Sequence, residues 1–210
     1  MLDFLDFLRN NPYPGRGIAV GNRRVYYFIM GRSANSRNRV FETTEDGIRT
    51  RAFDEAKVTD PSLIIYHPVR RSSLGLIVTN GDQTDTIRDM GCWRRALMTR
   101  EYEPDAPNWT PRISALLRPD GSFELSILKR EGDRCLRCFY SYEGCSEGEG
   151  RFLSTYQGDG NPLPSFSGEP LAIGMPEPEE VWAALNSENR VSLYANVNGQ
   201  VTLFNKNLGD

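Results

Sequence analysis

The feature that most restricts the fold is a long series of short strand-like segments separated by turn signals. These segments alternate apolar and polar side chains, or are rich in β-branched and aromatic residues, as strands are. We predict strands at residues 17–20, 25–30, 39–44, 48–53, 63–69, 74–79, 111–117, 123–129, 135–142 and 151–156. Hairpin turns are expected at Asp46–Gly47, Asp120–Gly121 and Asn198–Gly199, so the sheets should be antiparallel.

Helical patterns are fewer and flank the strands. An apolar stripe from Leu2 to Leu8 predicts a short helix that must end before Pro12. Residues 83–102 predict a helix broken near Gly91, and residues 176–189 predict another with Pro and Glu in its first turn. An early and a late group of strands with these helices favours an α+β fold, in which two antiparallel sheets pack face to face beneath outer helices.

Length and composition limit what this domain can bind. The 210 residues suffice for one domain with a substantial core, and no repeat or linker divides them, so we predict a single domain over 1–210. The net charge of -3 argues against a broad basic surface for nucleic acid or anionic membrane. No segment is long and apolar enough to span a membrane, and the start, MLDFLDFLRN, lacks the basic residues of a secretory signal. We therefore expect a cytoplasmic protein.

Cysteine and histidine are too sparse and too scattered to indicate a metal centre. In a reducing compartment the four cysteines, Cys92, Cys135, Cys138 and Cys145, are expected to be free thiols. Cys135 and Cys138 lie three apart on a predicted strand, so their side chains should point to opposite faces. The single histidine, His67, has no neighbouring nucleophile in the sequence, and we predict no metal.

The segment FIMGRSANSRNRVF, residues 28–41, concentrates fixed positive charge after a predicted strand. Arg32, Arg37 and Arg39 are planar, permanently charged donors, and Ser33 and Ser36 add hydroxyls, so the loop is suited to a phosphate. The alternative is a solvated loop, because the chain has only three lysines and uses arginine nearly everywhere.

Two further segments carry polar side chains suited to a ligand. IVTNGDQTDTI places Asn80 and Asp82 at a strand end, where they either bind a polar heterocycle or belong to a turn and helix cap. REYEPDAPNWTPRIS holds Glu101, Glu103 and Asp105 beside two prolines, a rigid presentation of carboxylates that general acid–base chemistry could use.

Six segments occur in an order that resembles one family, and the resemblance covers nearly the whole chain. They are NPYPGRGIAVG, YFIMGRSANSRNRVF, DPSLIIYHPVR, VTNGDQTDTI, EPDAPNWTPRIS and DGNPLPSF. The chain resembles the archaeal-type IMP cyclohydrolases, including bacterial members. The resemblance implies a four-layer α/β/β/α sandwich like that of the N-terminal nucleophile hydrolases. Their amino-terminal nucleophile is not expected here, because Leu2 follows Met1.

The resemblance also implies a reaction, the last step of de novo purine biosynthesis. A formylated aminoimidazole carboxamide ribonucleotide closes its six-membered ring with loss of water and gives inosine monophosphate. A purine ribonucleotide is then the expected small-molecule partner, with no metal or cofactor.

Position in the matching segments implies the site residues. Arg32, Tyr66 and Glu103 correspond to the catalytic residues: Arg32 for the oxyanion, Glu103 for proton transfer or for holding the carboxamide, and Tyr66 for the other proton step. The expected substrate-binding residues are Ser33, Ser36, Arg37, Arg39, Asn80, Asp82, Asn108 and Arg112. Loop lengths leave open whether Arg37 or Arg39 holds the phosphate, and whether Glu101 replaces Glu103.

Two other functions remain open to this sequence. One is a catalytically inactive sensor of the same fold that binds a purine nucleotide. The other is an RNA-binding module that uses the arginine loop with Tyr26, Tyr27 and Phe28, against which the acidic net charge argues. We expect no nucleic acid and no membrane as partners, and assembly into a homo-oligomer is left open.

Overall fold

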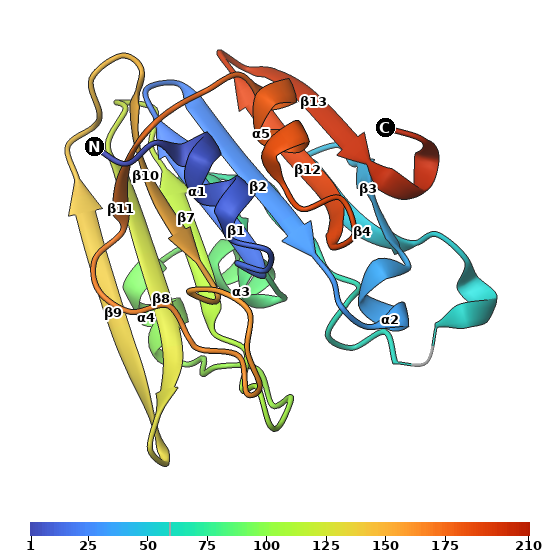
Figure 1. The fold of residues 1–210 in the computed structure, drawn as a ribbon. Helices are drawn as coiled ribbons and strands as arrows, with labels where there is room; N and C mark the ends of the chain where they lie inside the picture. The colour runs from blue at the N-terminus through green and yellow to red at the C-terminus, as the bar shows by residue number, and fades with distance from the viewer. Residues whose placement is uncertain (59) are drawn as a thin grey trace.

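Two antiparallel sheets form the centre of the protein, described here by a computed structural model of residues 1–58 and 60–210 (Figure 1). One sheet has six strands in the order β11-β10-β1-β2-β12-β13, and the other has seven in the order β3-β4-β5-β6-β7-β8-β9. The first sheet contains β1 (Arg16–Gly21), β2 (Arg24–Met30), β10 (Glu149–Ser154), β11 (Leu171–Gly174), β12 (Arg190–Val197) and β13 (Gln200–Asn205). The second contains β3 (Arg39–Thr43), β4 (Gly47–Ala52), β5 (Val69–Ser72), β6 (Gly75–Thr79), β7 (Arg112–Leu117), β8 (Phe123–Glu131) and β9 (Arg134–Tyr142).

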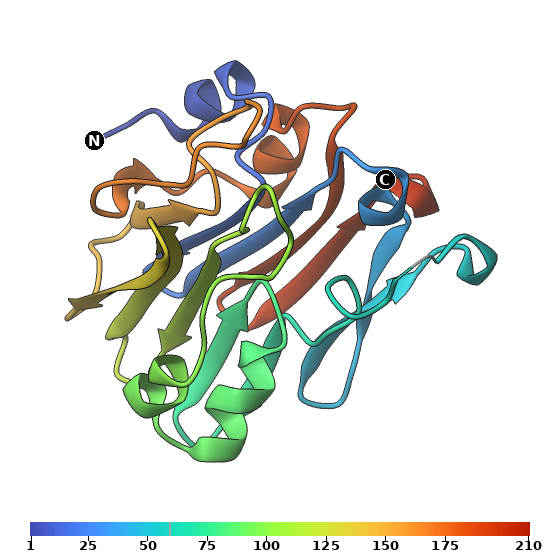
Figure 2. The same cartoon turned by 90° about the horizontal axis from the view of Figure 1, so that it is seen from below.

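Three apolar clusters show that the molecule has four layers, which Figure 2 shows end on. The central cluster lies between the sheets and joins residues such as Ile18 and Tyr27 of one sheet to Val78 and Ile113 of the other. Helices α1 (Phe4–Asn10) and α5 (Pro178–Ala184) pack on the outer face of the six-stranded sheet. Helices α3 (Gln83–Met90) and α4 (Trp93–Met98) cover the seven-stranded sheet. This arrangement confirms the predicted α+β sandwich, while the likeness to N-terminal nucleophile hydrolases stays a prediction.

Locally encoded features agree with the sequence. The three predicted hairpin turns join β3 to β4, β7 to β8 and β12 to β13. Asn198 and Gly199 both have positive φ, 54° and 88°, as a tight two-residue hairpin turn requires. Gly91 ends α3 in the left-handed conformation, which explains why the predicted helix is broken there. Cys138 lies in the central cluster and Cys135 at the outer one, on opposite faces of β9.

The predicted strand at 63–69 is wrong, because β5 begins only at Val69. The preceding residues form turns that are held by the side chain of Thr50 and by isolated backbone bonds, such as that from the amide of Thr50 to the carbonyl of Tyr66 at 2.9 Å, rather than by a strand ladder. The hydroxyl of Thr50 donates to the carbonyl of Ile64 at 2.7 Å and accepts from the amide of Tyr66 at 2.9 Å. The apolar run LIIYHPV resembles a strand in the sequence, but it forms a packed loop. Pro68 has no amide hydrogen to donate to a strand ladder, which disfavours a strand at this point.

The grouping of strands by position in the chain is also wrong. β1 and β2 pair with each other, but their outer neighbours are β10 and β12 rather than β3 to β6, so that Gly17 lies opposite Ser154 and Phe28 opposite Leu193. Such pairings between distant segments leave no local signal.

The terminal helix is shorter than the predicted 176–189, since α5 ends at Ala184. A short helix, α2 (Ala34–Arg37), and two 3-10 turns, η1 (Glu55–Lys57) and η2 (Lys206–Leu208), were not predicted.

None of the helices in residues 1–58 and 60–210 combines the length and apolar character needed to cross a membrane. Within the same described ranges, no group of three or more His, Cys, Asp or Glu side chains is placed to hold a metal ion.

Candidate functional site

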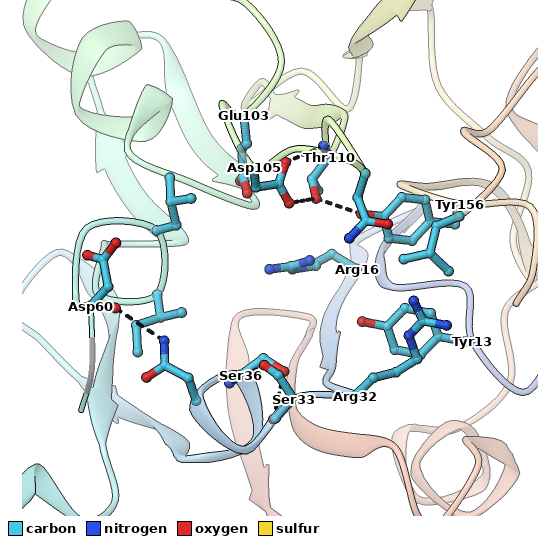
Figure 3. Close-up of a pocket in the computed structure, with 15 residues that line it drawn as sticks. Tyr13, Arg16, Arg32, Ser33, Ser36, Asp60, Glu103, Asp105, Thr110 and Tyr156 are labelled. Carbon is cyan, nitrogen blue, oxygen red and sulfur yellow. Dashed lines mark hydrogen bonds between the residues drawn. The ribbon is translucent and has the colours of Figure 1, made fainter. Parts of the chain in front are cut away.

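A cavity of about 330 Å³ opens at one end of the sandwich, where β1 and β7 begin and β2 and β10 end (Figure 3). Segments far apart in the chain build its walls. The polar lining consists of Tyr13, Arg16, Arg32, Ser33, Asn35, Ser36, Asp60, Glu103, Asp105, Asn108, Thr110 and Tyr156, and the apolar lining of Leu63, Ile64 and Leu163. The cavity therefore combines cations, carboxylates and phenols at one place.

Backbone contacts between strand ends hold this lining in position. The amide of Met30 donates to Gly15 at 2.9 Å, and the amide of Tyr156 donates to Pro14 at 3.1 Å. Gly15 has a φ of +80°, and a Cβ there would lie 2.2 Å from the hydroxyl of Thr155, so only glycine fits. The amide of Glu103 donates to the carbonyl of Thr110 at 2.8 Å, which closes the carboxylate loop.

Glu103 is the most perturbed carboxyl group in the cavity. Its side chain is buried, with the residue 2% exposed, and burial raises its pKa to about 7, although Arg16 and Arg112 act in the opposite direction. Burial by itself would lower the pKa of Arg16, but the negative charge of Glu103 raises it above the usual value. A carboxyl group divided between its two forms near neutral pH is suited to move protons.

A second buried cation lies behind the cavity. Arg39 is 0% exposed, its Nε donates to the carbonyl of Ser36 at 2.9 Å, and its Nη1 and Nη2 have no hydrogen-bond partner among the residues that the structure describes. Burial lowers the pKa of Arg39, while the hydroxyls of Tyr66 and Tyr27, 2.8 Å apart, lie near enough to influence it. A buried guanidinium group with only part of its hydrogen-bonding capacity used destabilises a protein interior, and such groups are typical of functional sites.

The structure separates the three arginines of the loop. Arg32 lies at the cavity mouth, where it stands 4.9 Å above the ring of Tyr13 and forms a 2.5 Å ion pair with Asp159. Arg37 does not line the cavity, because it donates to the carbonyl of Gly31 at 2.8 Å and to the side chain of Asn189 at 3.0 Å. Ser33 and Ser36 do line it, and Ser33 also caps α2 by accepting from the amide of Ser36.

The remaining predicted residues divide between the cavity and its surroundings. Asn108 lines the cavity. Arg112 and Asp82 lie beside it and form a 2.8 Å ion pair. The side chain of Asn80 accepts from the amide of Ile113 at 2.8 Å and donates to the carbonyl of Pro111 at 2.9 Å, which holds β6 to β7.

Tyr66 and Glu101, two residues considered for catalysis, both lie outside the cavity lining. The hydroxyl of Tyr66 meets that of Tyr27 and does not line the cavity. Glu101 has a side chain that is 67% exposed and lies 4.0 Å from Arg137, outside the cavity. Of the two glutamates left open by the sequence, Glu103 is thus the one that the cavity contains.

Sequence reasoning missed several lining residues. Tyr13 and Arg16 lie in the segment NPYPGRGIAVG, where Arg16 only precedes the predicted strand at 17–20. Tyr156 reads as the end of another strand, and Thr110 as a connector before β7. A polar or aromatic residue at a strand end next to Gly or Pro was the available signal, and it is a weak one.

Glu103→Gln should remove a pH dependence of stability. The folded protein raises the pKa of Glu103 from 4.5 to about 7, so ionisation of this group destabilises the fold as pH rises through that interval. Relative to Glu103→Gln, the free energy of unfolding of the wild type should fall by about 2.5 kcal/mol between pH 5 and pH 8. Urea denaturation at both pH values measures this difference. Parallel values for the two proteins would contradict it, and the exposed Glu101→Gln variant should follow the wild type.

Comparison with known proteins identifies the family. A family model described as IMP cyclohydrolase-like protein matches residues 13–201. Proteins named IMP cyclohydrolase from two strains of Halobacterium salinarum, R1 and NRC-1, are each 27% identical over 127 residues, which is 57% of this chain. The matched region spans 64% of the length of each relative. Since the family model covers most of the sequence, the chain belongs to the IMP cyclohydrolase-like protein family.

Proposed function

We propose that this protein is an IMP cyclohydrolase, which closes the ring of 5-formamidoimidazole-4-carboxamide ribonucleotide to give inosine monophosphate and water. The observation that carries the proposal is the buried Glu103, with a pKa raised to about 7 by burial, in a cavity that also contains Arg16 and the arginine–serine rim. The volume of about 330 Å³ lies within the range of small-molecule sites. The names of the two Halobacterium relatives support the same reaction.

The chemistry of ring closure asks for few protein groups. The carboxamide nitrogen and the formyl carbon belong to one molecule, so holding the formyl group over the carboxamide supplies much of the rate by proximity. A C–N bond forms, two protons leave nitrogen, and the formyl oxygen departs as water. The protein must stabilise negative charge on that oxygen and move the protons.

We assign the polar lining to these tasks. Glu103 exchanges protons with the substrate, and Arg16, which extends into the middle of the cavity in Figure 3, stabilises the developing oxyanion. Arg32, Ser33 and Ser36 lie together at the mouth and hold the 5′-phosphate, for which Arg32 must exchange its ion pair with Asp159. Asn108 offers its amide to the base.

The buried residues around the cavity then have supporting roles. Arg39 adds positive potential behind Glu103, and Tyr66, with Tyr27, influences Arg39 rather than reaching the substrate. Arg112 and Asp82 fix the floor beside Glu103 through their ion pair. Arg37 and Asn80 stabilise the loop and the sheet through the hydrogen bonds described above.

Arg32→Ala should raise KM by about tenfold or more and change kcat little. The reason is that a phosphate contact is equally strong in the ground state and the transition state, so its loss weakens binding without raising the chemical barrier. Arg37→Ala is the matched control, since Arg37 belongs to the same loop but does not line the cavity. Initial rates over a range of substrate concentrations measure both constants. A large fall in kcat at unchanged KM would instead assign Arg32 to the oxyanion.

The proposed function is tested by incubating the purified protein with the formylated ribonucleotide and following ring closure by ultraviolet absorbance. Saturable formation of inosine monophosphate, lost in Glu103→Gln, is the expected result. Nucleotide binding without turnover would indicate the sensor of the same fold. Absence of both binding and turnover would contradict the proposal and leave the family membership as a statement about ancestry and fold.

A further inference from the structure

We infer that Tyr156, Thr110 and Asp105 form a proton relay that opens into the cavity and works opposite Glu103 during ring closure. The inference rests on the proposed function and extends it by naming the second proton-transfer path. Figure 3 shows the three side chains in one row along the cavity wall, joined by hydrogen bonds.

The carboxylate of Asp105, at the end of this row, determines the directions of the hydrogen bonds in it. The carboxylate of Asp105 accepts from the amide of Thr110 at 2.6 Å, and its other oxygen accepts from the hydroxyl of Thr110. An ionised carboxylate only accepts, so the single hydroxyl proton of Thr110 is directed to Asp105. The hydroxyl of Tyr156, 2.6 Å from that of Thr110, must therefore be the donor to Thr110. Its oxygen keeps a lone pair that can accept a proton from a ligand.

The relay is rigid and largely shielded from solvent. Thr110 and Tyr156 are each 1% exposed. The ring of Tyr156 stacks on that of Tyr13, with centroids 6.0 Å apart and planes at 21°. Burial raises the pKa of Tyr156 to about 12, so the phenol stays neutral and passes a proton on rather than retaining a charge. A short fixed path of this kind suits proton transfer.

Other tyrosines near the cavity lack these features. Tyr13 lines the cavity, but its hydroxyl donates to the backbone carbonyl of Met30 at 3.5 Å, and a carbonyl cannot pass a proton onward. Tyr66 contacts Tyr27 and does not line the cavity. Among the described residues that line the cavity, Tyr156 is the phenol with an onward path to a carboxylate.

The relay and Glu103 together balance the protons of the reaction. As the carboxamide nitrogen attacks the formyl carbon, its proton passes to Tyr156, the proton of Tyr156 to Thr110, and that of Thr110 to Asp105. Protonated Glu103 gives its proton to the formyl oxygen, which leaves a carbinolamine. In the second half the relay returns its proton to the carbinolamine hydroxyl, which departs as water. Ionised Glu103 takes the proton of the nitrogen that carried the formyl group. Both groups end in their starting forms.

Thr110→Val tests the relay because valine matches the shape of threonine but has no hydroxyl. We expect kcat to fall by about 100-fold with KM changed less than about threefold, and Tyr156→Phe to show the same pattern. Thr110→Ser restores the hydroxyl and should restore most of kcat. Tyr26→Phe removes a tyrosine hydroxyl that donates to the carbonyl of Pro176 at 2.7 Å and does not line the cavity, so it should retain kcat. Thermal unfolding of each variant checks that the proteins are folded.

The number of protons in transit gives a readout that a merely structural role would not change. In mixtures of H2O and D2O, kcat of the wild type should follow a curved dependence on deuterium fraction, and Thr110→Val should follow a straighter one with a smaller isotope effect. Full kcat in Thr110→Val, or a change confined to KM, would overturn the relay while the cyclohydrolase function stands. A wild type that does not close the ring would overturn both.

Discussion

Glu103→Gln is expected to lower kcat for ring closure by about 100-fold to 10,000-fold, with little change in KM. Glutamine has nearly the shape of glutamate and can still hold the carboxamide, but it cannot give or take a proton. The residue is 2% exposed, so water cannot readily replace it as the proton carrier. Initial rates of inosine monophosphate formation measure the effect, and a retained kcat would remove Glu103 from the chemistry.

The neighbouring Glu101 provides the matched control. It lies two residues away but has a side chain that is 67% exposed outside the cavity, so Glu101→Gln should behave as the wild type. The pH profile adds a second check. Since Glu103 acts first as an acid and burial raises its pKa to about 7, kcat/KM should fall as pH rises above that value. A kcat/KM that rises through pH 7 would make Glu103 the initial base and reverse the direction of the relay.

Arg39→Met is expected to stabilise the protein and to lower its activity at the same time. Arg39 is fully buried, and two of its guanidinium nitrogens have no partner within residues 1–58 and 60–210; an apolar side chain of similar length avoids that penalty. The stabilisation should be about 1–3 kcal/mol, or roughly 2–4 °C in thermal midpoint for each kcal/mol. Activity should fall, because Arg39 contributes positive potential at Glu103. We expect kcat/KM to decrease by about tenfold or more.

Arg37→Met should show the opposite pattern. Arg37 donates to Gly31 and Asn189 and does not line the cavity, so its loss should lower the thermal midpoint and leave kcat/KM nearly unchanged. Thermal unfolding and initial rates on both variants decide the matter. If Arg39→Met destabilised the fold without changing kcat/KM, Arg39 would be a structural residue and its two unpartnered nitrogens would have no functional explanation.

Much of the site could be predicted, but not which side chains face the ligand. The segments that carry Arg32 and Glu103 stand out by composition, and both residues line the cavity. Arg16 and Tyr156 do not stand out, because a strand end is an ordinary place for either residue. They become part of the site only because β1 and β10 are neighbours, which places Gly17 opposite Ser154. The segments named by the family resemblance contribute residues to the cavity, and the structure distinguishes which of those residues line it.

Local chemistry in the sequence was enough to specify most strands and all three predicted hairpin turns, because side-chain alternation and a pair such as Asn198–Gly199 act over a few residues. The positions of the site side chains depend on how the two sheets assemble. Arg32, Arg37 and Arg39 lie within eight positions of one another, yet they end at the cavity mouth, on the loop surface and in the interior. Their directions depend on a short helix and on pairing between distant strands, and the burial that raises the pKa of Glu103 exists only when both sheets are packed.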